Sequence, residues 1–241
     1  MTKVAIIAAL AGELEPIVNG WPRESRNGVE LWRRRLDSGQ WVAACAGMGA
    51  GAASRAFAEI ERGGPMDLVV SVGWAGALDE RFAAGRAYRV SGVIDAATLE
   101  RFRAATPSGE CWLVTSDRVA NQAEKRRLAS DHGAGLVDME AAQVARLAAA
   151  RGVPFWCIKG VSDGLTDRLP DLNGFISASG GFQTARFILF AMLRPWHWPA
   201  LARMGADSRR AAKGMEASLR EVLERTPAMR AGGTGNAEAG E

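Results

Sequence analysis

The sequence predicts an α/β protein whose largely parallel sheet is covered by helices on both faces. Residues 4–9, 68–72 and 155–161 form continuous apolar runs, the pattern of strands that are buried on both faces. Segments with a helical spacing of apolar residues separate these runs, and alternation of strands with helices favours a parallel sheet. Ligands of such sheets bind at the carboxyl ends of the strands, so functional residues are expected there.

The first half of the chain is expected to form a strand, a helix, a hairpin, a second helix and a further strand. The turn residues Asp37-Ser38-Gly39-Gln40 separate two extended segments, which is typical of a hairpin. The glycine-rich stretch 47–51 then breaks the chain before a run of small and apolar residues with helical spacing. In order, we predict a strand at 4–9, a helix beginning at Glu13, strands at 31–36 and 41–46, a helix at 52–62 and a strand at 68–72.

The second half is expected to continue this alternation and to end in helices. The helix at 140–150 stops at Gly152, and Pro154 beyond it cannot continue a helix. The predicted strands are 88–95, 112–116, 136–138 and 155–161, and the predicted helices are 121–130, 140–150, 175–193 and 199–224. We divide the chain into a domain of residues 1–193, a helical extension of residues 194–225 and a disordered tail of residues 226–241.

Composition places the chain among folded proteins of a reducing compartment. The 241 residues are 48% hydrophobic with a formal net charge of +3, which excludes the disordered and collagen-like classes. Cys45, Cys111 and Cys157 are widely spaced, each within an apolar run. We therefore expect buried thiols rather than disulfides, a zinc site or a catalytic thiolate.

Charge and hydropathy exclude two further classes. The basic runs at 33–35, 125–127 and 209–210 lack interleaved aromatic residues, which indicates solvated faces and argues against nucleic-acid binding. The longest apolar candidate, residues 187–193, is far shorter than the roughly 20 residues that a membrane-spanning helix needs. The apolar amino terminus reaches Glu13 too soon for a secretion signal. A cytoplasmic location is the resulting expectation.

Four acidic residues follow predicted strands. Glu13, Asp138, Glu140 and Asp163 would meet at one rim of a mainly apolar sheet. A cluster of like charges raises some carboxyl pKa values, which is the condition for acid and base chemistry near neutral pH. The alternative is that each residue begins a helix and satisfies free backbone amides there.

Other catalytic patterns are weaker. Residues 47–52 formally match the GxGxxA dinucleotide-binding pattern, but Asp67, at the position of the expected ribose-binding acid, begins a strand instead of ending one. His132 and His197 assemble no nucleophilic triad, and no metal-ligand spacing is present. Carboxylate chemistry without a cofactor or metal is the interpretation that remains.

Several segments together resemble a known family. In chain order they are Lys3–Leu10 with Glu13, Gly47–Gly49, Val72–Leu78, Val137–Ala142 and Val161–Asp163. Their types and order are similar to those of the purine and uridine phosphorylase superfamily, and especially of its nucleosidases for methylthioadenosine and S-adenosylhomocysteine. The resemblance extends from residue 3 to about residue 192.

The resemblance implies a three-layer α/β/α fold around a mixed, partly barrel-like sheet, and cleavage of a nucleoside N-glycosidic bond. By the same resemblance, Glu13 activates the attacking water, Glu140 holds the ribose hydroxyls and Asp163 protonates or hydrogen-bonds N7 of the purine. A homo-oligomer is also implied. The other residues placed at the substrate are Gly47, Trp74, Ala75, Gly76, Val119, Asp138, Met139 and Ser162.

The chemistry suits those residue types. Breaking a glycosidic bond builds positive charge on the sugar and negative charge on the departing base. A carboxylate near the ribose and a protonated carboxyl near the base would each act where charge develops. Asp163 needs a raised pKa for that role.

Three departures from the family pattern bear on specificity. Trp74 stands where phosphorylases place a serine for phosphate, which puts phosphorolysis in doubt. Val119 and Ala120 stand where nucleosidases carry an aromatic and an aliphatic residue around adenine, which puts adenine specificity in doubt. Residues 94–112 are also shorter than in typical members, so the far end of the substrate is large or exposed.

The segment 194–201 has a composition of its own. Trp196 and Trp198 with the neighbouring Arg194 and Arg203 are typical of an anchor at a membrane surface, and the alternative is that these rings pack on the domain or across a subunit contact. The hopanoid-associated phosphorylase branch of the superfamily has a similar carboxyl-terminal region, which would fit a lipid-linked nucleoside.

The sequence therefore favours hydrolysis of a purine-type nucleoside. Phosphate-dependent cleavage, with a lipid-linked adenosine as one substrate, is the alternative within the enzyme class. A nucleoside-binding protein without turnover is the alternative from another class, motivated by the altered Trp74 and Val119 positions.

Overall fold

The computed structural model describes residues 2–36, 39–167 and 169–232, with side chains as far as Glu221. Its strands are β1 (Thr2–Ala8), β2 (Arg23–Arg26), β3 (Val29–Leu36), β4 (Gly39–Cys45), β5 (Leu68–Ala77), β6 (Ala87–Asp95), β7 (Arg101–Arg103), β8 (Cys111–Thr115), β9 (Leu136–Asp138) and β10 (Phe155–Asp163). Its helices are α1 (Ala11–Leu14), α2 (Ala50–Glu61), α3 (Gln122–His132), α4 (Ala141–Ala149), α5 (Thr184–Met192) and α6 (Trp198–Gly232), with short 3₁₀ turns η1 (Asn173–Phe175) and η2 (Pro195–His197).

These strands form a single mixed sheet that closes partly into a barrel. β5 pairs with β1, β9 and β10, and the path β5–β10–β6–β8–β9 returns to β5. β1, β4, β3 and β2 continue the sheet beyond this closed part. The expected partly barrel-like sheet is confirmed, as is the predicted hairpin, in which Leu31 pairs with Ala44 in antiparallel register. The expectation of a largely parallel sheet is too simple, because β10 with β6 and β5 with β9 also run antiparallel.

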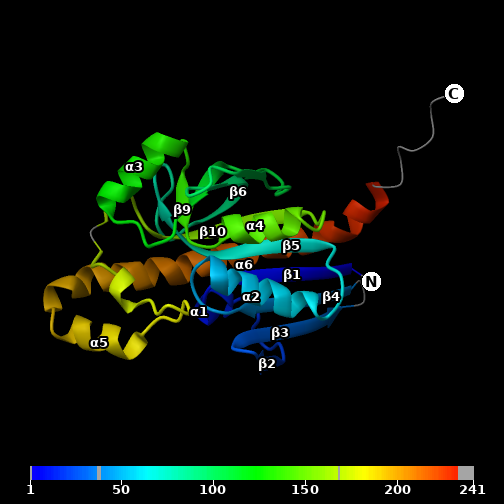
Figure 1. Ribbon diagram of the computed structural model, residues 1–241, viewed down its shortest axis with the longest axis horizontal. Coiled ribbons are helices and arrows are strands. Elements are labelled where there is room, and N and C mark those ends of the chain that lie inside the picture. Colours follow the sequence, from blue (N-terminus) through cyan, green and yellow to red (C-terminus); the bar gives the residue numbers. More distant parts are fainter. Residues whose placement is uncertain (1, 37–38, 168, 233–241) are drawn as a thin grey trace.

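Helices cover the sheet in layers (Figure 1). Side chains alternate along β1, so that Ala5 and Ile7 face a core shared with α2 and α4, whereas Val4 and Ile6 face a core shared with α6. Both sets are almost fully buried. This two-sided burial explains why the strand reads as a continuous apolar run.

Two predicted loops belong to strands. Residues 73–76 continue β5, and Ser162 and Asp163 continue β10, because the two strands pair with each other across the closed part of the sheet. Trp74 pairs with Gly160, and Gly76 pairs with Asp163. The functional segments are therefore held by sheet hydrogen bonds rather than by turns.

The predicted helix at 175–193 is wrong in its first half. Residues 176–183 form a turn in which Gly180 has φ +84°, a conformation that favours glycine, and Ile176 bridges Phe182. The Gly180 carbonyl accepts a hydrogen bond from the Met48 amide at 2.7 Å. This turn thus packs against the glycine-rich segment after β4, and α5 begins only at Thr184.

The carboxyl-terminal helix packs on the rest of the structure. Ala211, Met215 and Leu219 of α6 are buried, and Met215 and Leu219 share a core with strands β1, β5 and β10. The helix extends to Gly232, beyond the predicted start of the tail at Thr226, and residues 233–241 lie outside the described residues. The division at residues 193 and 225 stays a prediction. No helix within the described ranges is long and apolar enough to cross a membrane.

The cysteines behave as predicted at two of three positions. Cys45 and Cys157 are buried and Cys111 is partly exposed, and none forms a disulfide. Burial raises the pKa of all three thiols to about 12. A thiolate nucleophile is therefore disfavoured at neutral pH.

Candidate active site

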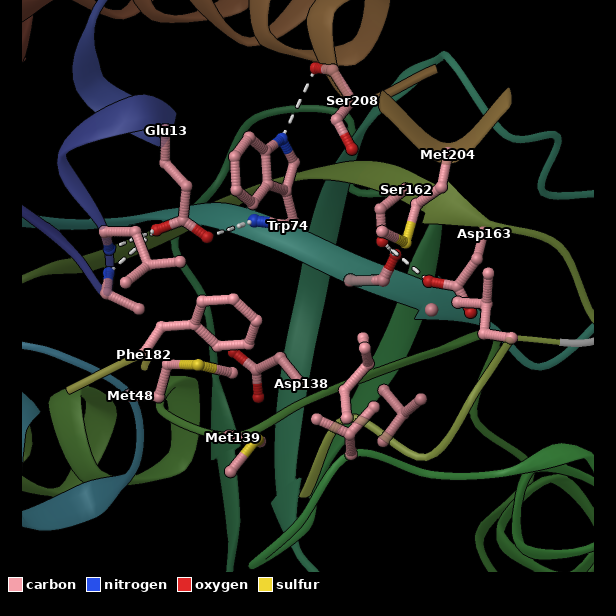
Figure 2. A pocket seen from close by; sticks show the side chains of 18 of the residues that line it. Glu13, Met48, Trp74, Asp138, Met139, Ser162, Asp163, Phe182, Met204 and Ser208 are labelled. Carbon is pink, nitrogen blue, oxygen red and sulfur yellow. Dashed lines mark hydrogen bonds between the residues drawn. The ribbon is translucent and has the colours of Figure 1, made fainter. Parts of the chain in front are cut away.

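A cavity of about 610 Å³ opens where β5, β9 and β10 meet the loop before α1 and the first turns of α6. This volume is typical of small-molecule sites. Figure 2 shows Glu13 at one side of the cavity and Asp163 at the other, with Asp138 and Met139 on the wall between them. Glu140 lines the same cavity. The four acidic residues singled out in the sequence are therefore brought together.

Glu13 is held by backbone amides. Its Oε2 accepts hydrogen bonds from the amides of Ala9 and Leu10 at 2.8 and 2.9 Å, and its Oε1 accepts one from the Trp74 amide at 2.9 Å. Burial raises the pKa of Glu13, although these three donors and Lys159 oppose the rise. A fixed carboxylate with a raised pKa is suited to accept a proton from water.

Trp74 occupies the space beside Glu13. Its indole Nε1 donates a hydrogen bond to the Ser208 carbonyl of α6 at 3.3 Å, so the ring spans from β5 to α6 (Figure 2). Arg209 follows Ser208 and also lines the cavity. The ring thus fills a position where phosphorylases carry a small hydroxyl side chain.

Asp138 and Lys159 form a buried ion pair beneath the cavity. Lys159 Nζ lies 2.9 Å from Asp138 Oδ2, and both side chains are at most 2% exposed. Asp138 also accepts hydrogen bonds from the Thr115 hydroxyl at 2.7 Å and the Ala141 amide at 3.0 Å. Burial opposes the charge on Lys159, but the charges of Asp138, Cys157 and Glu140 and the hydrogen bond to Asp138 together outweigh it and raise the pKa of Lys159 above its ordinary value. Both carboxylate oxygens of Asp138 are therefore occupied. The side chain holds Lys159 beneath the cavity and stabilises the start of α4 through the Ala141 amide.

Glu140 stands at the first position before α4. Its Oε1 accepts a hydrogen bond from the Gly49 amide at 2.7 Å, which joins the glycine-rich segment after β4 to the cavity. Burial, together with the carboxylates of Asp138 and Glu13, raises the pKa of Glu140 to about 8, although Lys159 opposes the rise. A pKa of about 8 favours the protonated form of Glu140 at neutral pH, and positive charge close to the carboxyl would favour its ionisation.

Asp163 is paired with a lysine. Lys125 Nζ of α3 forms an ion pair with Asp163 Oδ2 and donates to the Gly164 carbonyl at 2.7 Å. The Ser162 hydroxyl donates to Asp163 Oδ1 at 2.6 Å. The Lys125 side chain is 3% exposed and the Asp163 side chain is 14% exposed, so the lysine is buried behind a partly exposed carboxylate. The expected acid role of Asp163 stays a prediction, and the structure adds an ion-pair partner, Lys125, that the sequence did not indicate.

Much of the remaining lining of the cavity is apolar. It includes two aromatic rings, Phe182 and Phe187, whose centroids lie 5.4 Å apart. Figure 2 shows Phe182 and Met48 below Glu13, and Met204 above Ser162. The apolar side chains that complete this wall are Met48, Leu169, Leu172 and Met204.

Most residues expected at the substrate line this cavity. They are Glu13, Trp74, Ala75, Gly76, Val119, Asp138, Met139, Glu140, Ser162 and Asp163. Gly47 is not among the lining residues, because its backbone packs against Gly180; a Cβ there would lie 2.7 Å from the Gly180 carbonyl oxygen. Val119 is tied to η1 through Asn173, which accepts from its amide and donates to its carbonyl.

Sequence reasoning missed both lysines. Lys125 lies in a basic run, which predicted a solvated face, but the fold turns this one position of α3 inward. Lys159 lies inside the apolar run of β10 and could have been suspected, since a buried lysine needs an acidic partner. Within the described part of the chain no cluster of three His, Cys, Asp or Glu side chains is arranged to hold a metal ion.

Comparisons with known proteins agree with this architecture. Futalosine hydrolase of Helicobacter pylori superposes with a TM-score of 0.66 at 15% identity, covering 91% of this chain and 98% of that chain. The methylthioadenosine nucleosidase of Arabidopsis thaliana gives a TM-score of 0.67 at 16% identity, covering 93% and 95%. The methylthioadenosine/S-adenosylhomocysteine nucleosidase of Neisseria meningitidis, in complex with methylthio-immucillin-A, gives 0.60 at 20% identity, covering 88% and 100%. At these identities the likeness shows the fold.

The sequence itself identifies the family. A search of curated proteins finds no significant match. The family model described as the phosphorylase superfamily matches residues 3–110 and 96–180, which together span most of the chain and include all four acidic residues of the cavity. The chain therefore belongs to the phosphorylase superfamily.

Proposed function

We propose that the protein cleaves the N-glycosidic bond of a purine-type nucleoside, with water as the nucleophile. The observation that carries this proposal is the convergence of Glu13, Glu140 and Asp163 on one cavity of nucleoside-binding size. The different surroundings of the three carboxyl groups also support it. Glu13 is held by three backbone amides, Glu140 by the Gly49 amide, and Asp163 is paired with Lys125.

At the sugar, Glu140 is the group that stabilises developing positive charge. Its carboxyl releases its proton to solvent as the nucleoside binds, and the resulting carboxylate accepts hydrogen bonds from the ribose hydroxyls. As the C1′–N9 bond lengthens, this negative charge lies beside the oxocarbenium-like sugar. Lys159 and Asp138 beneath it keep the local charge balanced. Glu13 then takes a proton from water as the water oxygen bonds to C1′.

At the base, the Lys125–Asp163 pair supplies the proton. The bond electrons pass to the departing base, which gains negative charge and becomes a better proton acceptor than the Asp163 carboxylate. A proton moves from the Lys125 ammonium through Asp163 to a ring nitrogen. After the base has left, the neutral lysine takes a proton back from water in the cavity through Asp163. The pair thus performs the acid role that a lone Asp163 would need a raised pKa to perform.

The substituent on the ribose 5′ carbon is apolar in this account. Met48, Phe182, Phe187 and Met204 supply apolar surface to the cavity lining. An apolar substituent there removes these surfaces from water and gains binding free energy in proportion to the buried area.

The experiment is chromatographic detection of free base from a panel of purine nucleosides with hydroxyl, methylthio and long alkyl 5′ substituents. Base release without added phosphate is the expected result. Binding of a nucleoside with no release of base from any member would favour the non-catalytic alternative.

Phosphorolysis is the second candidate, and Arg209 is the observation that favours it. This exposed arginine lines the cavity next to Ser208, whose carbonyl is bonded to the Trp74 ring beside Glu13. It could hold a phosphate there even though no hydroxyl replaces the missing serine. Dependence of base release on inorganic phosphate, lost in Arg209→Gln, would select this candidate, with lipid-linked adenosine as one substrate to include.

A further inference from the structure

Large apolar side chains are exposed on one part of the surface. Among the described side chains, Leu99 is exposed near β7, whereas the other exposed large hydrophobic residues lie within residues 188–198 of α5, η2 and the start of α6. We name this patch the α5 face; its residues are Ile188, Leu189, Met192, Leu193, Trp196 and Trp198. Their exposed fractions run from 52% to 69%, so none of them is covered by the fold.

The α5 face is joined to the rest of the fold by ring contacts and a hydrogen bond. On the inner side of α5, the rings of Phe187 and Phe190 pack edge-on against Phe175. The indole of Trp198 donates a hydrogen bond to the Ala191 carbonyl at 2.8 Å, which ties the start of α6 to α5. Figure 1 shows α5 beside the first turns of α6, at the end of the molecule away from the carboxyl terminus.

The charged residues within the sequence segment that forms this face have one sign. Between Asp171 and Asp207 the sequence holds Arg186, Arg194 and Arg203 and no aspartate or glutamate. Arg194 lies over the Phe190 ring with its guanidinium carbon 4.3 Å from the ring centroid. Apolar and tryptophan side chains flanked by arginines match the boundary between lipid headgroups and acyl chains.

We propose that the α5 face docks onto the surface of a lipid bilayer that carries anionic headgroups. The apolar side chains enter the headgroup boundary, while the arginines remain at the level of the phosphates. A second copy of this chain is a poorer occupant, since a two-fold contact would bring the arginines of both copies together without a carboxylate from residues 172–206 to balance them.

Docking has a consequence for access to the cavity. Phe187 lines the cavity and is followed directly by Ile188 and Leu189 of the α5 face. The apolar wall of the cavity and the bilayer would therefore be neighbours, so a ligand with a long apolar substituent could reach the cavity without crossing water. The docking itself does not depend on which reaction the cavity performs.

The test is flotation of the full-length protein with vesicles of phosphatidylcholine alone or mixed with phosphatidylglycerol. We expect association with the mixed vesicles, weakened about fivefold in affinity for each arginine removed in Arg194→Gln and Arg203→Gln. Leu189→Glu combined with Met192→Glu should abolish it. Leu99→Glu, at a leucine of similar exposure elsewhere, is the matched control and should leave it unchanged.

Two results would overturn the proposal. One is a wild-type protein that floats with neither kind of vesicle. The other is a wild-type dimer in analytical ultracentrifugation that the Leu189→Glu/Met192→Glu variant converts to monomer, because the face would then be a subunit contact. Base release from a water-soluble nucleoside should be equal in wild type and this variant, so failure of docking is distinguishable from failure of the proposed reaction.

Discussion

Lys125 Nζ and Asp163 Oδ2 form an ion pair at one end of the cavity, in which the lysine side chain is buried and the aspartate side chain is 14% exposed. The lysine comes from α3 and the aspartate from the end of β10, so the pair exists only in the folded protein. Its position next to Ser162 makes it the polar group available to a departing base on that side.

The first prediction concerns this pair. Lys125→Met removes the proton source and should slow base release from a purine nucleoside by roughly 10²-fold or more. A nitrophenyl riboside, whose leaving group departs without a proton, should be hydrolysed at nearly the wild-type rate. Steady-state kinetics with both substrates make this comparison.

Glu13→Gln is the matched control for that experiment, because loss of the water-activating carboxylate should slow both substrates. Equal losses on both substrates for Lys125→Met would show that the lysine only maintains the structure of the site, and the proposed proton path would be wrong.

The second prediction concerns Glu140 and stability. The folded-state pKa of about 8 lies above the ordinary value of 4.5, so the folded protein retains a proton that the unfolded chain releases. The free energy of unfolding should therefore fall as pH rises from about 4.5 to about 8, by an amount on the order of a few kcal/mol. Glu140→Gln should remove this fall and be more stable than wild type at pH 8.

Urea unfolding at pH 5 and pH 8 measures the effect, with exposed Glu80→Gln as a control that should follow wild type. A Glu140→Gln variant as pH-sensitive as wild type would contradict the assignment.

The third prediction concerns the backbone beside Glu13. Gly73 has φ +140°, and a Cβ there would lie 3.0 Å from both carboxylate oxygens of Glu13. Gly73→Ala should displace that carboxylate and lower kcat for base release by roughly 10-fold or more, as expected for a misplaced catalytic group. Gly64→Ala places a methyl group at a similarly strained backbone position in open space, so it should retain wild-type kcat.

The fourth prediction concerns α6. Met215 is fully buried between α6 and the sheet, so Met215→Ala should lower the free energy of unfolding by about 2–5 kcal/mol. Met192→Ala, at an exposed methionine of α5, should change it by less than about 0.5 kcal/mol. Similar small values for both would mean that α6 is a separable extension of the domain.

The sequence was sufficient for most of the strands because each buried strand is apolar on both faces. Leu68–Val72 and Phe155–Val161 read clearly as strands. Their continuations through Trp74 and Asp163 did not, since glycine and polar residues there are stabilised by pairing between strands distant in the sequence. The turn at Gly180 was hidden for a related reason: its partner is the Met48 amide, far away in the chain.

The acidic residues of the site could be recognised from their positions after strands and from family motifs. The ion pairs that these acidic residues form could not be recognised in the sequence. Lys125 pairs with Asp163 and Lys159 pairs with Asp138 only because the fold brings them close together. A basic residue on a charged helix looks solvated until the orientation of that helix is known. The proposed role of Asp163 in proton transfer therefore depends on Lys125, a partner that the sequence does not identify.

The most direct measurement of the central claim is the rate of free-base release from a purine nucleoside in phosphate-free buffer, for wild type, Glu13→Gln, Glu140→Gln and Asp163→Asn. The account predicts release by wild type, unchanged by added phosphate, and a loss of roughly 10²-fold or more in each variant. Wild-type rates in the variants, or no release by a wild-type protein that binds the nucleoside, would contradict it.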